Sequence, residues 1–316
     1  MEPHFDHAGS AVMTQKRIIF IHGLQGPGAD PLPPEDVCLR EWRQALRKSL
    51  WVDIPDDATQ MAYWGDCRRP AQLEDRSARA GQARLRRRLR RFEARFAYHP
   101  DKLLRWTRAL TVQFLFDLYC RLVRRAGPLL CQIEREWLKD YYLYFHSAAD
   151  RAKIRGRLEA KLDSAAQQGH RVAVIAHSMG TVIALDALYK SEARKETTGQ
   201  TRYDVDLFVT MGSPLGLTPV QVDLTSDPTA ALVGQAHPPF PGNVHRWLNV
   251  FDGIDTATLL DRRLANDFTD HGMARIVDRM IRSNVGPDGQ RDPHHWYGYL
   301  SCEEVGDAVS KFWAAP

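Results

Sequence analysis

The stretch RVAVIAHSMGT, residues 171–181, decides the fold of this chain. It opens with a short apolar run of the kind that forms a buried strand in a parallel sheet. The run continues without a break through Ser178 into Thr181–Lys190, a segment of helical composition. A strand that passes directly into a helix predicts a tight turn, and such a turn lifts the Ser178 side chain clear of the backbone.

Similar apolar runs lie on both sides of this stretch and alternate with segments of helical periodicity. The predicted strands are 18–21, 61–64, 171–176, 206–210, 247–251 and 275–281. The predicted helices are 39–50, 147–168, 181–190 and 302–313. Strands that alternate with helices predict an α/β fold, in which helices cover both faces of a mostly parallel, doubly wound sheet.

Residues 65–140 interrupt this alternation with an Arg-rich segment. Apolar side chains recur at helical spacing among its arginines, at Leu85, Leu89, Phe92 and Phe96. We therefore expect a core made of 14–64 and 141–316, a helical cap insertion over 65–140 and a flexible N-terminus over 1–13.

The Arg-rich insertion has three interpretations. Its arginines are simply solvated on a cap, or a basic amphipathic helix contacts an anionic membrane, or the segment contacts nucleic acid or protein. Because no nucleic-acid motif accompanies the charge, nucleic acid is the least favoured partner.

Composition excludes several classes of protein. The chain has 316 residues, of which 44% are hydrophobic and 26% charged, and its net charge of +4 indicates no strong partner preference. Its five cysteines form no CxxC pair, so neither a zinc site nor a disulfide framework is expected. The first ten residues contain no apolar segment typical of a signal peptide. We expect a cytoplasmic protein, with peripheral membrane contact as the alternative.

The turn at Ser178 has the features of a nucleophile site. A serine hydroxyl reacts only beside a base, and a tight turn needs small residues two positions away, here Ala176 and Gly180. The turn also places Ser178 at a helix N-terminus, where backbone N–H groups can stabilise an oxyanion. The alternative is a serine that only caps the helix.

A second oxyanion donor is expected after the first strand, in His22-Gly23-Leu24. We predict that the N–H groups of Leu24 and Met179 form the oxyanion hole and that His22 orders the loop. A simple glycine turn is the alternative for this segment.

A base and an acid should follow the nucleophile in the order Ser, Asp, His. Asp252 and Asp255 come directly after the fifth predicted strand, and Asp255 is preferred as the acid. His294 and His295 lie in the last loop, and His294 is preferred as the base. His271 precedes the last predicted strand and is less well placed. The acid that is not used is expected to cap a turn.

Five segments together resemble the lipase/esterase-like α/β-hydrolases, in particular bacterial proteins related to the GPI-inositol-deacylase-like branch. The resemblance covers about residues 16–64 and 150–313, and the sequence departs from the family pattern at Ala176, at Thr256 and in its doubled histidine. The segments are FIHGL (20–24), IAHSMG (175–180), TMGSPLG (210–216), WLNVFDGID (247–255) and PHHWYGYL (293–300).

The resemblance implies an α/β-hydrolase fold and a Ser178, His294 and Asp255 triad that cleaves carboxylic esters through an acyl-enzyme. It implies no metal and no organic cofactor, and a small-molecule or lipid ester as substrate. An acyltransferase or thioesterase would use the same triad. A non-catalytic protein that binds a lipid or a partner is the alternative from another class.

Overall fold

The structure is a computed structural model, and its description is confined to part of the chain. The described residues are 15–23, 33–67, 141, 144–145, 147–199, 201–225, 238–255, 257–258, 262–270, 273–283, 286, 289 and 292–316. The Arg-rich segment beyond Cys67, the N-terminal residues 1–13 and the candidate Leu24 lie outside them. The predictions made for these parts therefore stay predictions.

One parallel sheet organises the described residues. Its strands are β1 (Lys16–Ile21), β2 (Thr59–Met61), β3 (Arg171–His177), β4 (Leu207–Met211), β5 (Trp247–Asp252) and β8 (Ile276–Ile281). They lie in the order β2-β1-β3-β4-β5-β8, and every neighbouring pair is parallel. Both predicted core segments contribute strands to this sheet. The expected α/β fold with a parallel sheet is confirmed.

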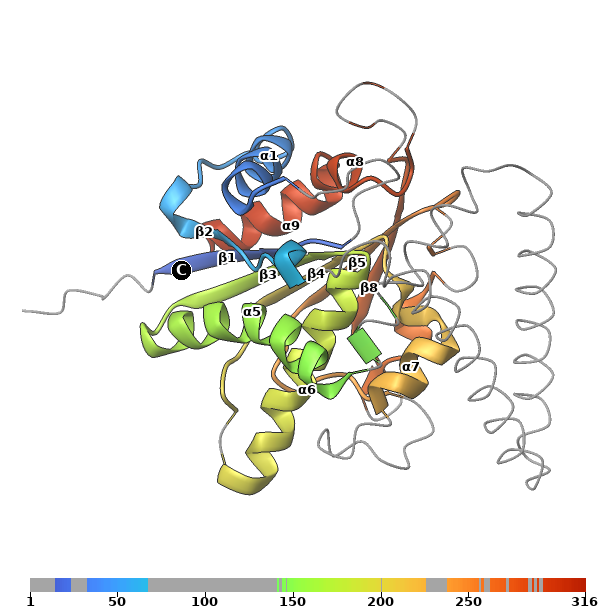
Figure 1. Ribbon diagram of the computed structural model, residues 1–316. Coiled ribbons are helices and arrows are strands. Elements are labelled where there is room, and N and C mark those ends of the chain that lie inside the picture. Colours follow the sequence, from blue (N-terminus) through green and yellow to red (C-terminus); the bar gives the residue numbers. More distant parts are fainter. Residues whose placement is uncertain are drawn as a thin grey trace, which may run out of the picture.

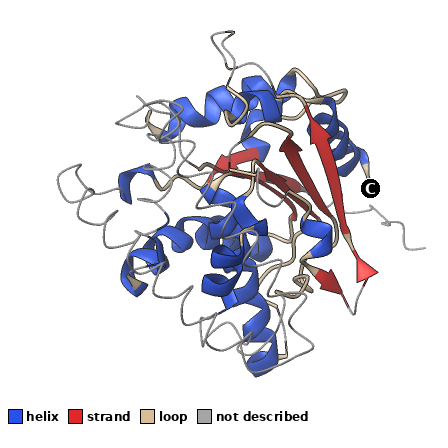
Figure 2. Ribbon diagram, turned by 90° about the vertical axis from the view of Figure 1, so that its right-hand side faces the viewer, coloured by secondary structure: helices blue, strands red, loops and turns tan. Residues whose placement is uncertain are grey.

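The helices form a layer on each face of the sheet, as Figures 1 and 2 show. The first layer contains α1 (Glu35–Arg47), α8 (Trp296–Leu300) and α9 (Glu303–Ala314). The opposite layer contains α5 (Ala148–Gln167) and α6 (Met179–Thr198), with α7 (Thr218–Thr225) beside α6. The remaining elements are η1 (Asp56–Ala58), η2 (Gly65–Cys67), η4 (Pro214–Gly216), η5 (Leu264–Asn266) and a hairpin of β6 (Thr269–Asp270) and β7 (Met273–Ala274).

Alternation along each strand fills both layers of the core. In β1, Ile19 and Ile21 belong to the cluster that includes α5 and α6, whereas Ile18 and Phe20 belong to the cluster of α1, α8 and α9. All four side chains are fully buried, and each contributes about 1.5–3 kcal/mol of transfer free energy. This two-sided burial explains why the central strands are continuous apolar runs.

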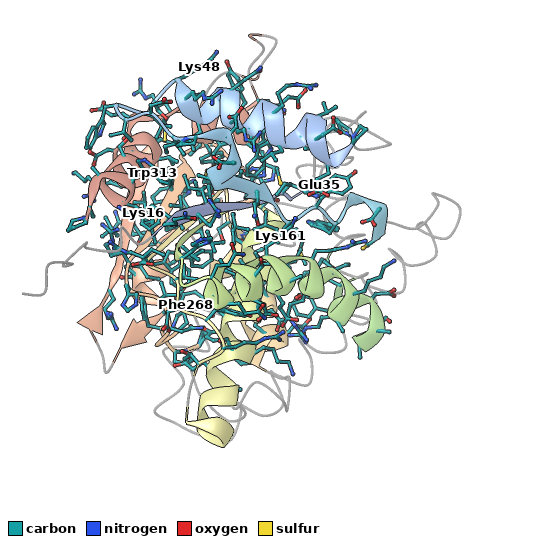
Figure 3. The ribbon with its side chains drawn as sticks, turned by 90° about the vertical axis from the view of Figure 1, so that its left-hand side faces the viewer. Lys16, Glu35, Lys48, Lys161, Phe268 and Trp313 are labelled. Carbon is teal, nitrogen blue, oxygen red and sulfur yellow. The ribbon has the colours of Figure 1, made fainter. Side chains whose placement is uncertain are left out.

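The amino end of β1 contacts the end of α9, which is far away in the sequence. Lys16 lies beside Trp313, near the end of α9 (Figure 3), and its ammonium group donates to the Trp313 carbonyl at 2.7 Å.

None of the helices in the described part of the chain has the length and apolar composition that a membrane crossing needs.

Several predicted boundaries are wrong. The second strand was expected at 61–64, but β2 ends at Met61 because Trp64 instead packs against the loop after β1. Its indole N–H donates to the carbonyl of His22 at 2.7 Å. The helix expected at 39–50 runs over Glu35–Arg47, and the one expected at 181–190 extends over Met179–Thr198. Helices α7 and α8 and the short hairpin were not predicted.

Candidate active site

Ser178 occupies the turn between β3 and α6 in a strained conformation. Its φ angle is 53°, and no other non-glycine residue of the described ranges has a positive φ. An L-residue in this region of conformational space costs of order 1–3 kcal/mol. Ser178 is fully buried. The tight turn that the sequence predicted between strand and helix is therefore present.

Two glycines allow the turn to pack against the loop after β1. A Cβ atom at Gly23 would lie 2.4 Å from Cβ of Ser178 and 2.6 Å from the carbonyl oxygen of His177. A Cβ atom at Gly180 would lie 2.6 Å from the carbonyl oxygen of Ile21. All three distances are too short for a side-chain carbon, so glycine is required at both positions.

Three predicted site residues meet in one hydrogen-bonded line. Oγ of Ser178 lies 3.0 Å from Nε2 of His294. Nδ1 of the same imidazole lies 2.9 and 3.0 Å from the two carboxylate oxygens of Asp255. Because a carboxylate only accepts, Nδ1 carries the proton and Nε2 is free to accept one from the hydroxyl.

The carboxylate of Asp255 is fully buried and accepts two further hydrogen bonds. The N–H of Ala257 donates to Oδ1 at 2.9 Å, and the hydroxyl of Tyr299 donates to Oδ2 at 2.6 Å. The Tyr299 oxygen in turn accepts from the N–H of Asp252 at 3.0 Å. These bonds fix the orientation of the Asp255 carboxylate toward His294.

The charge of Asp255 changes the proton affinity of the base. Burial alone would lower the pKa of His294, but the Asp255 carboxylate and its hydrogen bond raise it above the usual histidine value. The imidazole can therefore hold a proton more readily than a free histidine does.

The less favoured candidates have other partners. The carboxylate of Asp252 accepts from the N–H of Ser283 and, at 2.9 Å, from the N–H of Ile254, so it closes its own turn. Nδ1 of His295 accepts from the N–H of Tyr297 at 3.2 Å and caps α8. His271 lies outside the described residues.

The two expected oxyanion donors are Met179, which the structure describes, and Leu24, which lies outside the described residues. Met179 is the first residue of α6, and an N–H at this position has no acceptor within its own helix. Gly23, the residue before Leu24, comes so close to the start of α6 that a Cβ atom built on it would lie 2.9 Å from the Met179 nitrogen. The expected role of His22 in ordering the loop is supported, because its Nδ1–H faces the Gly23 carbonyl at 2.9 Å and its Nε2 accepts from the Trp64 N–H at 3.1 Å.

The position of the site follows from the strand order. The chain moves outward from β1 to β2 and then returns to β3, so the direction of winding reverses between β1 and β3. A crevice forms outside the carboxyl ends of strands at such a switch point. Ser178 follows β3 and Gly23 follows β1, while Asp255 follows β5 and His294 comes after β8. All four therefore gather at one edge of the sheet.

Two residues near the triad were not predicted to act there, Tyr299 and His177. Tyr299 is part of the aromatic-rich segment that follows the paired histidines. This segment helped to identify His294 as the base, but it did not predict the hydrogen bond from Tyr299 to Asp255. His177 was read only as part of the turn, yet its Nε2 lies 2.8 Å from the carbonyl oxygen of His294.

The described residues contain no group of three or more His, Cys, Asp or Glu side chains arranged to hold a metal ion. The described cysteines are Cys38, Cys67 and Cys302, and none of these three forms a disulfide. Comparison of the chain with protein-family models, with curated proteins and with solved structures found no match. The function must therefore be argued from the site itself.

Proposed function

We propose that this chain is a serine hydrolase of the α/β-hydrolase type that cleaves carboxylic esters, with Ser178 as nucleophile. The observation that carries the proposal is the hydrogen-bonded line from Oγ of Ser178 through His294 to Asp255. A serine that served only as a helix cap would not need a partly buried imidazole and a fully buried carboxylate aligned behind it.

In the proposed reaction, Oγ of Ser178 attacks the ester carbonyl carbon while Nε2 of His294 takes the hydroxyl proton. Asp255 stabilises the imidazolium that forms. The tetrahedral intermediate collapses when the imidazolium gives its proton to the leaving alcohol, and an acyl-enzyme remains. A water molecule, deprotonated by His294, then attacks the acyl carbon, and Ser178 regains its proton as the carboxylic acid leaves.

The developing oxyanion would be held by backbone N–H groups. Met179 supplies one donor at the N-terminus of α6, where the helix dipole adds to its effect. Leu24 is proposed as the second donor on the basis of its sequence position. One such donor contributes about 10²- to 10³-fold to kcat.

The Arg-rich insertion is proposed, from its sequence, as a helical cap that brings a lipid or other ester to the site. Contact with an anionic membrane would add a surface for lipid substrates. Flotation with neutral and anionic vesicles separates this proposal from a merely solvated cap. Unchanged affinity after reversal of the charges of Arg86–Arg91 would rule out the membrane contact.

The test is the hydrolysis of nitrophenyl esters of rising acyl length, with and without detergent micelles. We expect turnover by the wild type and a loss of about 10⁴- to 10⁶-fold in kcat for Ser178→Ala and for His294→Ala. His295→Asn is the matched control and should keep near wild-type turnover, because asparagine can still cap α8.

Matching thioesters, and product analysis with added alcohols, decide between the hydrolase and its chemical relatives. A preference for thioesters would assign a thioesterase, and transfer of the acyl group to the alcohol would assign an acyltransferase. Full turnover by Ser178→Ala would contradict all three.

A further inference from the structure

His177 is a buried histidine that the proposed reaction does not use. It ends β3 and directly precedes Ser178, and its side chain is almost fully buried. Its ring centroid lies 4.9 Å from that of His294, 5.9 Å from that of Tyr299 and 6.5 Å from that of Trp42. Burying an imidazole among aromatic rings costs free energy unless its polar nitrogen atoms make a compensating hydrogen bond.

The bond that His177 makes is to the main chain of the base. Its Nε2 lies 2.8 Å from the carbonyl oxygen of His294. A carbonyl oxygen only accepts, so Nε2 carries the proton and His177 donates. The imidazole therefore connects the strand that presents the nucleophile with the loop that presents the base.

Two other bonds hold the same loop. The hydroxyl of Ser283 donates to the carbonyl of Pro293 at 2.8 Å, and the N–H of His294 donates to Oδ1 of Asp292 at 3.1 Å. Ser283 follows β8, and Asp292 belongs to the loop itself. Of these three bonds, only the one from His177 links the loop to the element that carries Ser178.

We propose that His177 is a positioning residue, whose Nε2–H bond to the His294 carbonyl keeps the base in reach of Ser178. The proposal rests on the proposed hydrolase function for its effect on rate. A displacement of about 1 Å between reacting groups can lower a rate by about 10²-fold, so one bond at this point has a large effect.

The charge state of His177 suits this role. Burial, followed by the nearby His294, His295 and His22, holds the pKa of His177 well below the usual histidine value. His177 therefore stays neutral while His294 gains its proton. A second positive charge beside the imidazolium would oppose that protonation.

The test compares two variants at position 177. His177→Gln keeps an amide N–H donor at a similar reach, whereas His177→Met fills similar space without a donor. We expect His177→Met to lower kcat about 10- to 100-fold with KM changed less than about threefold, because orientation and not binding is lost. His177→Gln should recover kcat to within about threefold of the wild type, and His295→Asn should show no loss.

A second measurement does not depend on turnover. Proton and nitrogen NMR of the imidazoles reports the proton on Nδ1 of His294 that Asp255 holds, and the protonated nitrogen of His177. We expect the His294 signal to broaden or shift in His177→Met and to return in His177→Gln. The wild type should show His177 protonated at Nε2.

Each outcome decides one of the two claims. If the wild type cleaves no ester but the His294 signal responds to His177→Met, the hydrolase proposal fails and the positioning role stands. If His177→Met keeps both wild-type kcat and the wild-type His294 signal, the positioning role is wrong. If His177→Met does not fold, a wild-type spectrum with His177 protonated only at Nδ1 would overturn the role by itself.

Discussion

At the scale of single residues, Ser178 combines backbone strain with a central place in the site. A position with a positive φ angle is usually occupied by glycine unless the side chain of another residue is needed there. The hydroxyl of Ser178 faces Nε2 of His294, and this contact gives the reason for retaining the strain. Strain that persists at one position is a common property of functional sites.

The strain predicts an unusual order of stabilities. Both Ser178→Ala and Ser178→Gly lack the hydroxyl, but only glycine adopts this φ angle without cost. We expect the free energy of unfolding of the glycine variant, measured by chemical denaturation, to be about 1 kcal/mol higher than that of the alanine variant. At Ser283, whose φ is not positive, the order should reverse. An alanine variant more stable than glycine at 178 would contradict the strained turn.

The pKa of His294 predicts the pH dependence of the reaction. The base must be neutral to accept the hydroxyl proton, so kcat/KM falls as the pH drops through the pKa of His294. Because Asp255 raises this pKa, the acidic limb should lie above the usual histidine value. Asp255→Asn removes the charge, so the limb should move to lower pH, while the plateau falls by about 10⁴-fold. A limb that stays in place in Asp255→Asn would show that another group titrates.

Tyr299 offers a test of how the acid is held. Its hydroxyl donates to Asp255 and accepts from the N–H of Asp252, and both groups are buried. Tyr299→Phe should lower the free energy of unfolding by about 1.5–3 kcal/mol, because a bond to a charged group is lost. We also expect kcat to fall about tenfold. Tyr297→Phe, at a partly exposed position of the same helix, is the control and should change stability by less than about 0.5 kcal/mol.

At the scale of elements, α5 and α6 are joined by a buried ionic group. Asp186 of α6 bonds with Arg151 and Arg155 of α5, and the Tyr144 hydroxyl also donates to it. Burial opposes its ionisation, but the two arginines hold the pKa of Asp186 below its usual value. The resulting stabilisation is present above the unfolded-state pKa and is lost as pH falls through the folded value.

Removing this carboxylate leaves two arginines without their buried partner. Asp186→Asn should therefore lower the free energy of unfolding by about 3–5 kcal/mol in chemical denaturation at neutral pH. Asp307→Asn removes an exposed pair with Lys311 and should cost less than about 1 kcal/mol. Equal effects of the two substitutions would show that the Asp186 group does not join the helices.

Whether a helix or strand could be predicted depended on whether its own consecutive residues carry a clear sequence pattern. The central strands were predicted well, since each is an apolar run between polar or glycine residues. The second strand was predicted too far along the chain because Tyr63 and Trp64 are as apolar as typical strand residues. In the structure their rings instead pack against the ring of His22. Helix α8 has five residues, too few to show a periodic pattern.

At the scale of the whole molecule, the sheet explains why three distant residues could be predicted together. Ser178, Asp255 and His294 follow different strands whose carboxyl ends share one edge, so chain order and strand ends narrowed the acid to Asp252 or Asp255 and the base to His294 or His295. The contacts of Tyr299 and His177 could not be predicted in this way. Each depends on which groups become neighbours after α8 packs on the sheet, and the sequence carries no local signal for that packing.

The most direct test of the central claim is labelling with a fluorophosphonate, which reacts with a serine only when a base activates it. Intact mass and peptide mapping would locate the adduct. The proposed triad predicts one adduct per chain, on Ser178, with none in Ser178→Ala and a much slower reaction in His294→Ala. A folded wild-type protein that forms no adduct, or forms it at another residue, would contradict the assignment of Ser178 as the nucleophile.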